Sequence, residues 1–413
     1  MGGMSDTSAD SVGPLQGLKV VELGQLIAGP FAAKTLADFG ADVIKIEPPQ
    51  GDLSRLTFGP NYKGESSHYL SWNRNKKGII LDLRTSSGKE AFYDLVRISD
   101  VVLNNFRAGV VDRLDIGHNK LKILNPRIIS VNVTGMGPLG PYRDRPSVES
   151  TAAGLSGILS VTGEPGGRPV RPGPAMSDLA NAQYAVIATL SALYEREKTG
   201  VGQNIDVSLL GASVAYMGYH ISYYTCSGMV PEPLGSGYPF TAPYGAYKTA
   251  DSYVVLGPCW PRIARAVGAE WLIDDPRFST ADARLAHRKE LDAEIEKCLA
   301  VAKTDEWLEI FYAEDIVAGP LKKVDEVVAD PQVNALKMIL DLEHPLGGRI
   351  KVAGNPIMMD SLSGEPTAPP TLGQHTEEVL RDLLHYTDEK IRTLRAEQKT
   401  TDLETRLHTR KEK

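Results

Sequence analysis

Two carboxylates are the residues of this chain best suited to do chemistry. Asp178 lies at the start of a run of small and apolar residues that extends to Leu193 and predicts a helix. Ser177 or Asp178 can cap that helix, and a carboxylate at a helix N-terminus is favoured in its charged form. An ionised aspartate there is either a simple cap or a nucleophile that needs no base to activate it. Glu149 can form an acid–base or covalent pair with Asp178, or be an unrelated surface group.

The remaining patterns do not support thiol, serine or metal chemistry. Cys226, Cys259 and Cys298 lie far apart, and the histidines form no ligand pair at helical spacing. No Gly-x-Ser-x-Gly elbow occurs, and no Ser–His–Asp or Cys–His arrangement can be recognised. We therefore expect no metal, and the cysteine usage fits a reducing cytoplasm.

Composition narrows the class of protein. A chain of 413 residues exceeds what one hydrophobic core usually supports, so two lobes are expected. The formal charge of −7 argues against a nucleic-acid partner, and no apolar run is long enough to predict a membrane span. The segment from Met1 to Gln16 has no Lys or Arg and no apolar core, so we expect neither a secretory signal nor a transit peptide. Asp6 also breaks the N-myristoylation pattern that starts at Gly2.

Elements that could position the carboxylates follow an alternating pattern. Leu18–Leu23 is a strand, Gly29-Pro30 opens a helix that ends at Phe39 before a capping Gly40, and residues 42–46 form a second strand. Further strands are predicted at 78–83, 100–105, 127–133 and 204–209, with a helix at 86–98. This βα alternation predicts a doubly wound, Rossmann-like α/β lobe with a parallel sheet.

The sequence changes in character after about residue 225. Residues 231–247 are rich in Pro, Gly and aromatics, residues 247–256 resemble a hairpin, and amphipathic helices are predicted at 258–268, 281–300 and 304–314. We therefore predict a large lobe over residues 1–224 and a smaller α+β lobe over 225–330. Residues 331–413 are expected to pack back on the large lobe.

The first strand–helix turn does not fit a dinucleotide cofactor. It runs from Gly24 to Gly29 without a G-x-G-x-x-G pattern, although Glu47 ends the next strand where a ribose-binding acid would lie. The Gly-Pro helix start still exposes backbone N–H groups that can hold a phosphate or a carbonyl.

Three other segments are candidate ligand loops: residues 72–77, residues 104–109 with Arg113, and the glycine-rich loop 135–141. Ligands of open α/β sheets bind beyond the carboxyl ends of the strands. Phe106 can stack on a purine or belong to the core. The cations able to neutralise phosphates are Arg74, Lys76, Lys77, Arg84 and Arg113. The alternative for each segment is surface charge on a loop.

Taken in order, these segments resemble family III CoA-transferases, the group that includes formyl-CoA transferase and carnitine CoA-transferase. The resemblance covers nearly the whole chain and is densest before Leu210. It is carried by Ala28-Gly-Pro30, Leu36–Glu47, Gly51-Asp52 with Arg55, Asn73–Lys76, Asn105–Val110, Gly135–Tyr142 and Thr199–Val207.

The resemblance implies a mechanism. In the family, the aspartate before the long helix is a nucleophile that forms an acyl anhydride and then an aspartyl-CoA thioester, and Asp178 occupies that position. It implies transfer of CoA from an acyl-CoA donor to a free carboxylic acid, with CoA as a substrate and no separate cofactor. Glu149 is expected to order the site near the thioester. Backbone N–H groups of Gly235 and Gly237 are expected to stabilise oxyanions.

The resemblance also assigns contacts to CoA. They are Ala28, Leu81, Arg84, Asn105, Phe106 and Arg113, with the loop of Asn73, Arg74, Asn75 and Lys76 as a further candidate. A family arginine after the second strand is replaced by Pro48. A family lysine before the Glu149 position is replaced by Pro146, and the neighbouring Arg145 can substitute for it. Ile27 stands where formyl-CoA transferases have glutamine, and their glycine loop is shortened to residues 235–237, which weakens any inference about oxalate as acceptor.

One position separates transfer from racemisation. The related α-methylacyl-CoA racemases use a histidine just before the acid at position 149, together with the Asp178 position, as a proton-transfer pair. Val148 stands in place of that histidine and cannot exchange a proton, so transfer is favoured. The alternatives are a racemase or epimerase with another base, and a non-catalytic CoA-binding subunit.

Family members form interlocked homodimers, so the resemblance implies a homodimer. The expected small-molecule partners are an acyl-CoA and a carboxylate, with no nucleic acid and no membrane. Four tyrosines either line an acceptor pocket or belong to the core, and burial statistics favour the core. They are Tyr219, Tyr223, Tyr238 and Tyr244.

Overall fold

The computed structural model describes residues 13–57 and 59–398. The expectations about targeting rest largely on residues before Gly13, which lie outside the described part. The chain divides into two compact units. Unit 1 contains Met1–Gly157, Gly173–Gly218 and Asn334–Lys413, and unit 2 contains Ile158–Pro172 and Tyr219–Val333. The segment 158–172, which the sequence pattern placed in the large lobe, therefore belongs to unit 2.

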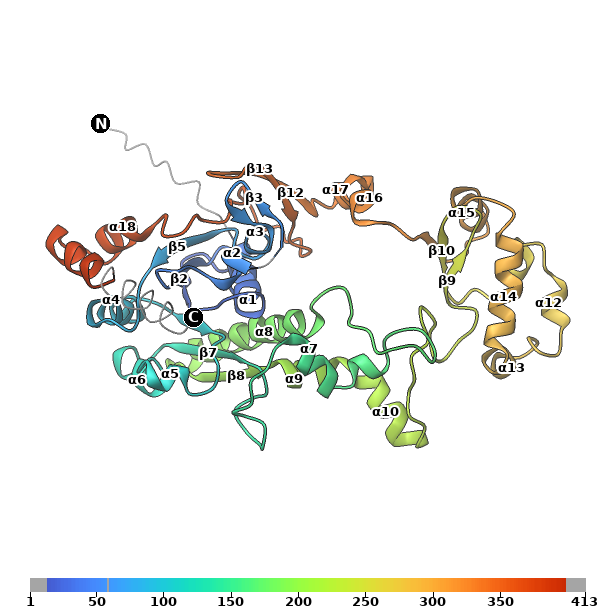
Figure 1. The fold of residues 1–413 in the computed structure, drawn as a ribbon, viewed down its shortest axis with the longest axis horizontal. Coiled ribbons are helices and arrows are strands. Elements are labelled where there is room, and N and C mark those ends of the chain that lie inside the picture. The colour runs from blue at the N-terminus through green and yellow to red at the C-terminus, as the bar shows by residue number, and fades with distance from the viewer. Residues whose placement is uncertain (1–12, 58, 399–413) are drawn as a thin grey trace, which may run out of the picture. The chain divides into compact units, whose positions relative to one another are not determined.

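A six-stranded parallel sheet forms the centre of unit 1 (Figure 1), with strand order β5-β2-β1-β6-β7-β8. Its strands are β1 (Lys19–Glu22), β2 (Asp42–Glu47), β5 (Lys76–Ile80), β6 (Val101–Asn104), β7 (Ile129–Thr134) and β8 (Asn204–Ser208). The predicted α/β class with a parallel sheet is confirmed. The strand predicted at 78–83 starts earlier, at Lys76, because Lys76 pairs with Val43 of β2.

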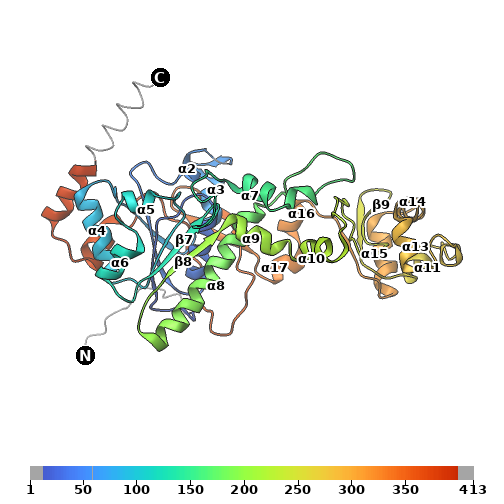
Figure 2. The same cartoon turned by 90° about the horizontal axis from the view of Figure 1, so that it is seen from below.

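Helices cover both faces of this sheet. Along β1, Val20 contributes to the core on one face and Val21 to the core on the other, because successive residues of a strand point in opposite directions. The Val20 face packs against α1 (Ala28–Asp38) and α8 (Met176–Thr199), and the Val21 face against α4 (Ser86–Arg97) and α6 (His118–Leu124). Figure 2 shows α8 running beside β7 and β8.

Shorter elements and the C-terminal segment complete unit 1. The His375 N–H donates to the Gly78 carbonyl at 2.9 Å, and the Thr376 hydroxyl accepts from the Ile80 N–H at 3.0 Å, so this segment lies along the β5 edge. These elements are α2 (Leu53–Thr57), β3 (Asn61–Tyr62), β4 (Glu65–Ser66), α3 (Ser67–Trp72), α5 (Val110–Arg113), α7 (Glu149–Leu155), α9 (Leu209–Tyr216), β12 (Ile339–His344), β13 (Gly348–Ala353), α18 (Thr376–Glu378) and a π-helix (Val379–Leu383).

Unit 2 combines a small antiparallel sheet with helices. The predicted hairpin is present as β9 (Gly245–Lys248) and β10 (Tyr253–Leu256), and β11 (Ala318–Pro320) pairs with β10. The helix predicted at 281–300 is interrupted at His287. The helices are α10 (Gly218–Ser227), which starts at the last residue of unit 1, α11 (Arg262–Ala266), α12 (Trp271–Asp274), α13 (Ala281–Ala286), α14 (Arg288–Leu299), α15 (Thr304–Ala313), α16 (Val324–Ala329) and α17 (Pro331–Ala335), which ends in unit 1.

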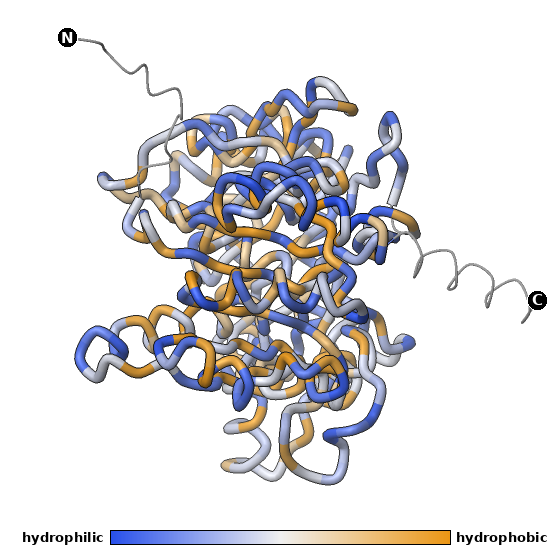
Figure 3. The backbone as a smooth tube through the Cα atoms, turned by 90° about the vertical axis from the view of Figure 1, so that its left-hand side faces the viewer, coloured by the Kyte–Doolittle hydropathy of each residue, from blue (hydrophilic) through white to orange (hydrophobic). Residues whose placement is uncertain are grey.

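Hydrophobic and hydrophilic residues alternate along the coloured helices (Figure 3). Among the described residues, none of the helices combines the length and the hydropathy that a membrane-spanning segment needs.

Candidate active site

The first turn of α8 lies at the carboxyl edge of the sheet. Near the start of the helix, the Asn181 amide donates to the carbonyl of Thr134, the last residue of β7, at 3.3 Å. Near its end, Arg196 donates to the Arg127 carbonyl at 3.1 Å and to Asp100 at 2.9 Å, and these two residues precede β7 and β6. The helix therefore runs antiparallel to the strands, and its N-terminus reaches the edge where α/β sheets bind ligands.

Asp178 is a first-turn residue of α8 and not its cap. The helix begins at Met176, and its N-cap residue, Ala175, makes no side-chain capping hydrogen bond. The Leu179 N–H bonds to the Ala175 carbonyl at 3.0 Å, so the helix starts before Ser177 and the predicted cap was wrong. The partly exposed Asp178 carboxylate still lies at the positive end of the helix dipole, which favours its charged form.

Two buried polar side chains flank Asp178 on α8. Ser177 and Asn181 are fully buried. Within the described residues, the Ser177 Oγ and the Asn181 Oδ1 have no hydrogen-bond partner. A buried polar atom without a partner is unfavourable, so these atoms are candidates to bind a ligand or water. The sequence carried a signal for Asn181, since asparagine is unusual inside an apolar helix, but the prediction missed it.

Glu149 is the first residue of α7, a helix that packs against α8. Val148 is the N-cap residue of α7, and its N–H donates to the Thr151 hydroxyl at 3.0 Å. Unit 1 therefore holds Glu149 and Asp178 in the first turns of two neighbouring helices.

Asn105, which follows β6, holds the turn after β1 through two hydrogen bonds. The Asn105 Oδ1 accepts from the Gln25 N–H at 2.8 Å, and its Nδ2 donates to the Gln25 carbonyl at 2.7 Å. A Cβ at Gly29 would lie 3.3 Å from the Asn105 Cγ, so glycine allows this close approach. Ala28 opens α1 beside this clamp, and the partly buried Phe106 packs on the adjacent hydrophobic core.

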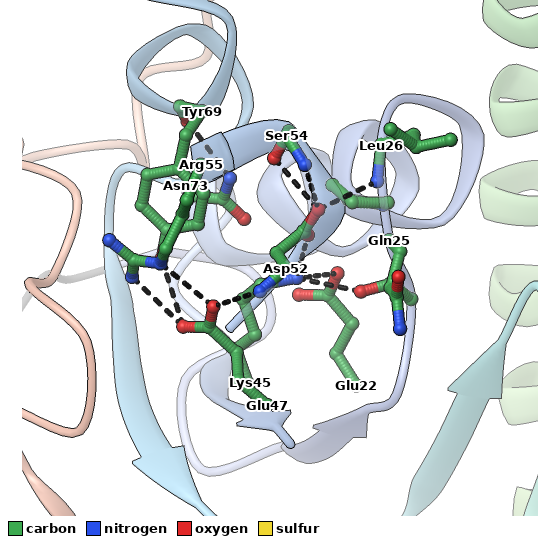
Figure 4. A network of polar contacts seen from close by, with 12 residues as sticks. Glu22, Gln25, Leu26, Lys45, Glu47, Asp52, Ser54, Arg55, Tyr69 and Asn73 are labelled. Atoms are coloured by element: carbon green, nitrogen blue, oxygen red, sulfur yellow. Dashed lines mark hydrogen bonds and ion pairs between the residues drawn. The ribbon is translucent and has the colours of Figure 1, made fainter. Parts of the chain in front are cut away.

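A buried ionic network contacts the same turn through Lys45 and Asp52 (Figure 4). The Lys45 ammonium lies 2.7 Å from the Gly24 carbonyl, 2.9 Å from the Asp52 carboxylate and 3.3 Å from that of Glu22. The other Asp52 oxygen accepts from the Leu26 N–H at 3.1 Å. Burial lowers the pKa of Lys45, but the carboxylates of Glu22 and Asp52 outweigh it and raise that pKa above its usual value. Burial acts to raise the pKa of Asp52, yet Lys45 and the hydrogen bonds lower it to about 2.

Glu47 belongs to a neighbouring part of this network. Arg55 binds both Glu47 oxygens, at 2.8 and 2.9 Å, and also the Glu65 carboxylate at 2.9 Å. The Arg55 guanidinium lies 3.5 Å from the centre of the Tyr69 ring. Glu47 is therefore an ion-pair partner of Arg55.

The segment Asn73–Lys76 leads into β5, ends at the first residue of that strand and is largely buried. Arg74 forms an ion pair with Asp38 at 2.6 Å, and Asn75 donates to the same carboxylate at 2.8 Å. The Lys76 ammonium lies 2.7 Å from Glu22 and 2.9 Å from both the Pro30 carbonyl and the Asn73 amide oxygen. Burial lowers the pKa of Lys76 to about 8 against the opposing effect of Glu22. These contacts favour a structural role for the loop and differ from the surface charge considered as the alternative.

The other predicted CoA contacts differ in exposure. Leu81 is buried and its N–H donates to the Glu47 carbonyl at 3.0 Å. Arg84 is about half exposed and pairs with Asp82 at 2.7 Å. Arg113, on α5, and Arg145 are exposed, and the Arg145 guanidinium lies 3.8 Å from the centre of the Tyr142 ring.

Gly235 and Gly237 belong to unit 2, and their N–H groups are already used. The Gly235 N–H donates to the Gly163 carbonyl at 2.8 Å, and the Gly237 N–H to the Leu234 carbonyl at 2.9 Å. In this structure both amides therefore donate to main-chain carbonyls of unit 2.

The four tyrosines of unit 2 are not core residues. Tyr219 and Tyr238 are exposed by 46% and 37%, and Tyr223 and Tyr244 are half-buried. The prediction that they belong to the core was wrong. They form an aromatic cluster with Phe240, in which the ring centres lie 5.4–6.2 Å apart.

Known proteins are similar to this chain in sequence and in fold. The model of CoA-transferase family III matches residues 15–376. Succinyl-CoA:glutarate CoA-transferase of Homo sapiens is 33% identical, over 94% of this chain and 90% of that protein. Succinyl-CoA–D-citramalate CoA-transferase of Chloroflexus aurantiacus is 36% identical, over 93% of this chain and 97% of that protein.

A solved structure agrees with these matches. The crystal structure of a CaiB/BaiF family protein from Brucella suis superposes with a TM-score of 0.82 at 35% identity, covering 90% of this chain and 100% of that one. The chain therefore belongs to CoA-transferase family III, and it is an enzyme that moves CoA between acyl-CoA thioesters and carboxylic acids.

Proposed function

We propose that Asp178 is the nucleophile of this transfer and carries CoA as a thioester. The observation that supports this most is the position of Asp178, partly exposed in the first turn of α8 at the carboxyl edge of the sheet. An aspartate is ionised at neutral pH without a base, and the helix dipole reinforces that state.

The proposed reaction has two half-reactions. The Asp178 carboxylate attacks the donor thioester carbonyl, forms a mixed anhydride and expels CoA as a thiolate. The thiolate then attacks the Asp178 carbonyl, releases the donor acid and leaves aspartyl-CoA. The acceptor carboxylate attacks this thioester, and the returning thiolate takes the acceptor acyl group, which restores the aspartate.

Other residues have supporting roles in the proposal. Glu149, on the neighbouring α7, orders the site near the thioester. The first turn of α1, which begins at Ala28 beside the turn held by Asn105, offers backbone N–H groups to CoA. Phe106 and Leu81 border this edge of the sheet. The exposed side chains of Arg84, Arg113 and Arg145 neutralise the phosphates.

For the substrates, we propose succinyl-CoA as donor and a small dicarboxylic acid as acceptor. The two relatives described above are named as succinyl-CoA-dependent enzymes whose acceptors are glutarate and D-citramalate. A panel of mono- and dicarboxylic acids, assayed with succinyl-CoA and acetyl-CoA, tests this choice. Turnover with acetyl-CoA as donor but not with succinyl-CoA would contradict it.

Oxygen transfer tests the chemistry. When the acceptor carries ¹⁸O in its carboxylate, one labelled oxygen should appear in the side chain of Asp178 after a single turnover. Asp178→Asn should remove both the label and the turnover. A labelled product formed without label in Asp178 would contradict the mechanism.

We also propose a homodimer, because the family resemblance implies one. Light scattering coupled to gel filtration should give about twice the chain mass of 44.8 kDa. A mass equal to that of one chain would contradict the homodimer.

A further inference from the structure

Unit 2 contains a cavity whose lining residues have no role in the reaction steps described above. Its volume is about 320 Å³, and its walls include Tyr223, Met229, Phe240 and Arg288. A mostly apolar cavity of this size with a few polar groups is typical of a site for a small organic ligand.

Arg288 is held in place but is not fully satisfied. It is the first residue of α14, and its Nη2 donates to the main-chain carbonyls of Tyr238 and Thr241. Its Nη1 is buried and, among the described residues, has no hydrogen-bond partner. Since a guanidinium stays protonated, this leaves a charged donor without an acceptor, which is unfavourable unless a ligand supplies one.

The groups around Arg288 leave this donor available. Asp292, one turn along α14, is engaged by the Tyr247 hydroxyl at 2.7 Å. A Cβ at Gly237 would lie 3.1 Å from the Arg288 Nη1, so glycine keeps that space open. Glu232 lines the cavity and adds one negative charge, which favours a singly charged group over a phosphate dianion.

The other walls suit a carbon chain. The Tyr223 and Phe240 rings have their centres 5.7 Å apart, and Met229 lies on the same cavity. Burial lowers the pKa of His220, which also lines the cavity, so this imidazole is neutral at pH 7. The positive charge of the cavity therefore belongs to Arg288.

We propose that this cavity binds the carboxylate of a small organic acid, with Arg288 as its anion ligand. The Nη1 of Arg288 donates to one carboxylate oxygen, and the aromatic wall covers the carbon chain. This inference rests on the proposed function in one respect: the acid is the free acid of the transfer reaction.

A charge placed at the cavity tests the proposal without disturbing the Arg288 hydrogen bonds. Val230 lines the cavity and is 73% exposed. Calorimetric titration of the full chain with glutarate, without CoA, should show binding that Val230→Glu weakens about tenfold and that Val230→Gln leaves within twofold. Pentane-1,5-diol, which lacks the carboxylates, should not bind. Equal glutarate affinity of the Glu and Gln variants would overturn the proposal, and so would an absence of glutarate binding.

Arg288 variants give a second, kinetic test. Arg288→Gln should raise the KM for the acid at least tenfold and change the KM for the acyl-CoA less than twofold, and Arg288→Lys should restore part of the loss. Arg284→Gln is the matched control, because Arg284 also holds two main-chain carbonyls but does not line the cavity. Equal increases in both KM values, or the same effect from Arg284→Gln, would overturn the role of Arg288.

Failure of this inference can be told apart from failure of the proposed chemistry. Titration of Asp178→Asn with glutarate should give the wild-type affinity. Loss of the ¹⁸O label with intact glutarate binding would contradict only the nucleophile.

Discussion

The loop that enters β5 and the loop that leaves β6 look alike in sequence and differ in the structure. Residues 73–76 and 104–107 both combine asparagine with a basic residue. The first loop precedes its strand, and its side chains are buried in ion pairs with Asp38 and Glu22. The second follows its strand, clamps the turn after β1 through Asn105 and leaves Arg107 exposed.

For these two segments, position relative to the direction of the strand matters more than composition. Ligands of a parallel sheet bind where strands end, so a polar loop at a strand start has a different task. Polar groups that satisfy one another inside the protein hold the scaffold. Groups left accessible at the carboxyl edge are the ones available to a substrate.

The largest expected effect comes from the segment that enters β5, at the first residue of that strand. Lys76→Met should lower the free energy of unfolding by about 3 kcal/mol at pH 7, because it leaves the buried Glu22 carboxylate with one cation fewer. Lys77→Met is the matched control. The Lys77 side chain is 42% exposed and its ammonium pairs with Glu378 at 3.3 Å, so a change below about 1 kcal/mol is expected. Denaturant unfolding of both variants measures this contrast. A similar loss of unfolding free energy in the two variants would contradict it.

The parts of this fold that follow from local pattern could be predicted. The alternation of β-rich and helical segments is enough to place β1, α1 and β2, since each carries its own strand or helix signal and Gly40 marks the helix end. The resemblance then pointed to Asp178. The rest depends on distant partners: Asp38 meets Arg74, and Gly163 meets Gly235, only after folding. The donor left open on Arg288 has no sequence signal at all.

The loop after β6 should have a smaller effect on stability and a clear effect on binding. Asn105→Ala removes two hydrogen bonds to Gln25 and should lower the free energy of unfolding by about 1–2 kcal/mol. It should also raise the KM for the acyl-CoA about tenfold with little change in the KM for the acid. Asn61→Ala, at an exposed turn, is the control. An unchanged acyl-CoA KM in Asn105→Ala would leave this loop with a purely structural role.

The ionic network that contacts the turn after β1 predicts an acid-dependent loss of stability. The pKa of Asp52 in the folded protein, about 2, lies below its usual value of 3.8, so the unfolded chain takes up the proton first. Its contribution is therefore complete above about pH 4 and is lost as the pH falls towards 2. Between pH 5 and pH 3 the wild type should lose about 1 kcal/mol more than Asp52→Asn. Parallel losses in the two proteins would show that Asp52 does not carry this dependence.

The smallest effect on stability is expected at Arg145. Its side chain is exposed and stacks on Tyr142, so Arg145→Ala should change the free energy of unfolding by less than about 0.5 kcal/mol. If it neutralises a CoA phosphate, the acyl-CoA KM should rise about threefold at low salt and converge on the wild-type value at high salt. A KM equal to that of the wild type at low salt would remove Arg145 from the CoA site.

Asp178 is the residue on which the account depends, and its covalent state can be measured directly. The full-length enzyme is incubated with succinyl-CoA in the absence of an acceptor, quenched in acid and digested for mass spectrometry. The peptide containing Asp178 should gain the mass of CoA less one water, and an added acceptor acid should discharge it. Turnover with an unmodified Asp178 peptide, or undiminished turnover in Asp178→Ala, would contradict this mechanism.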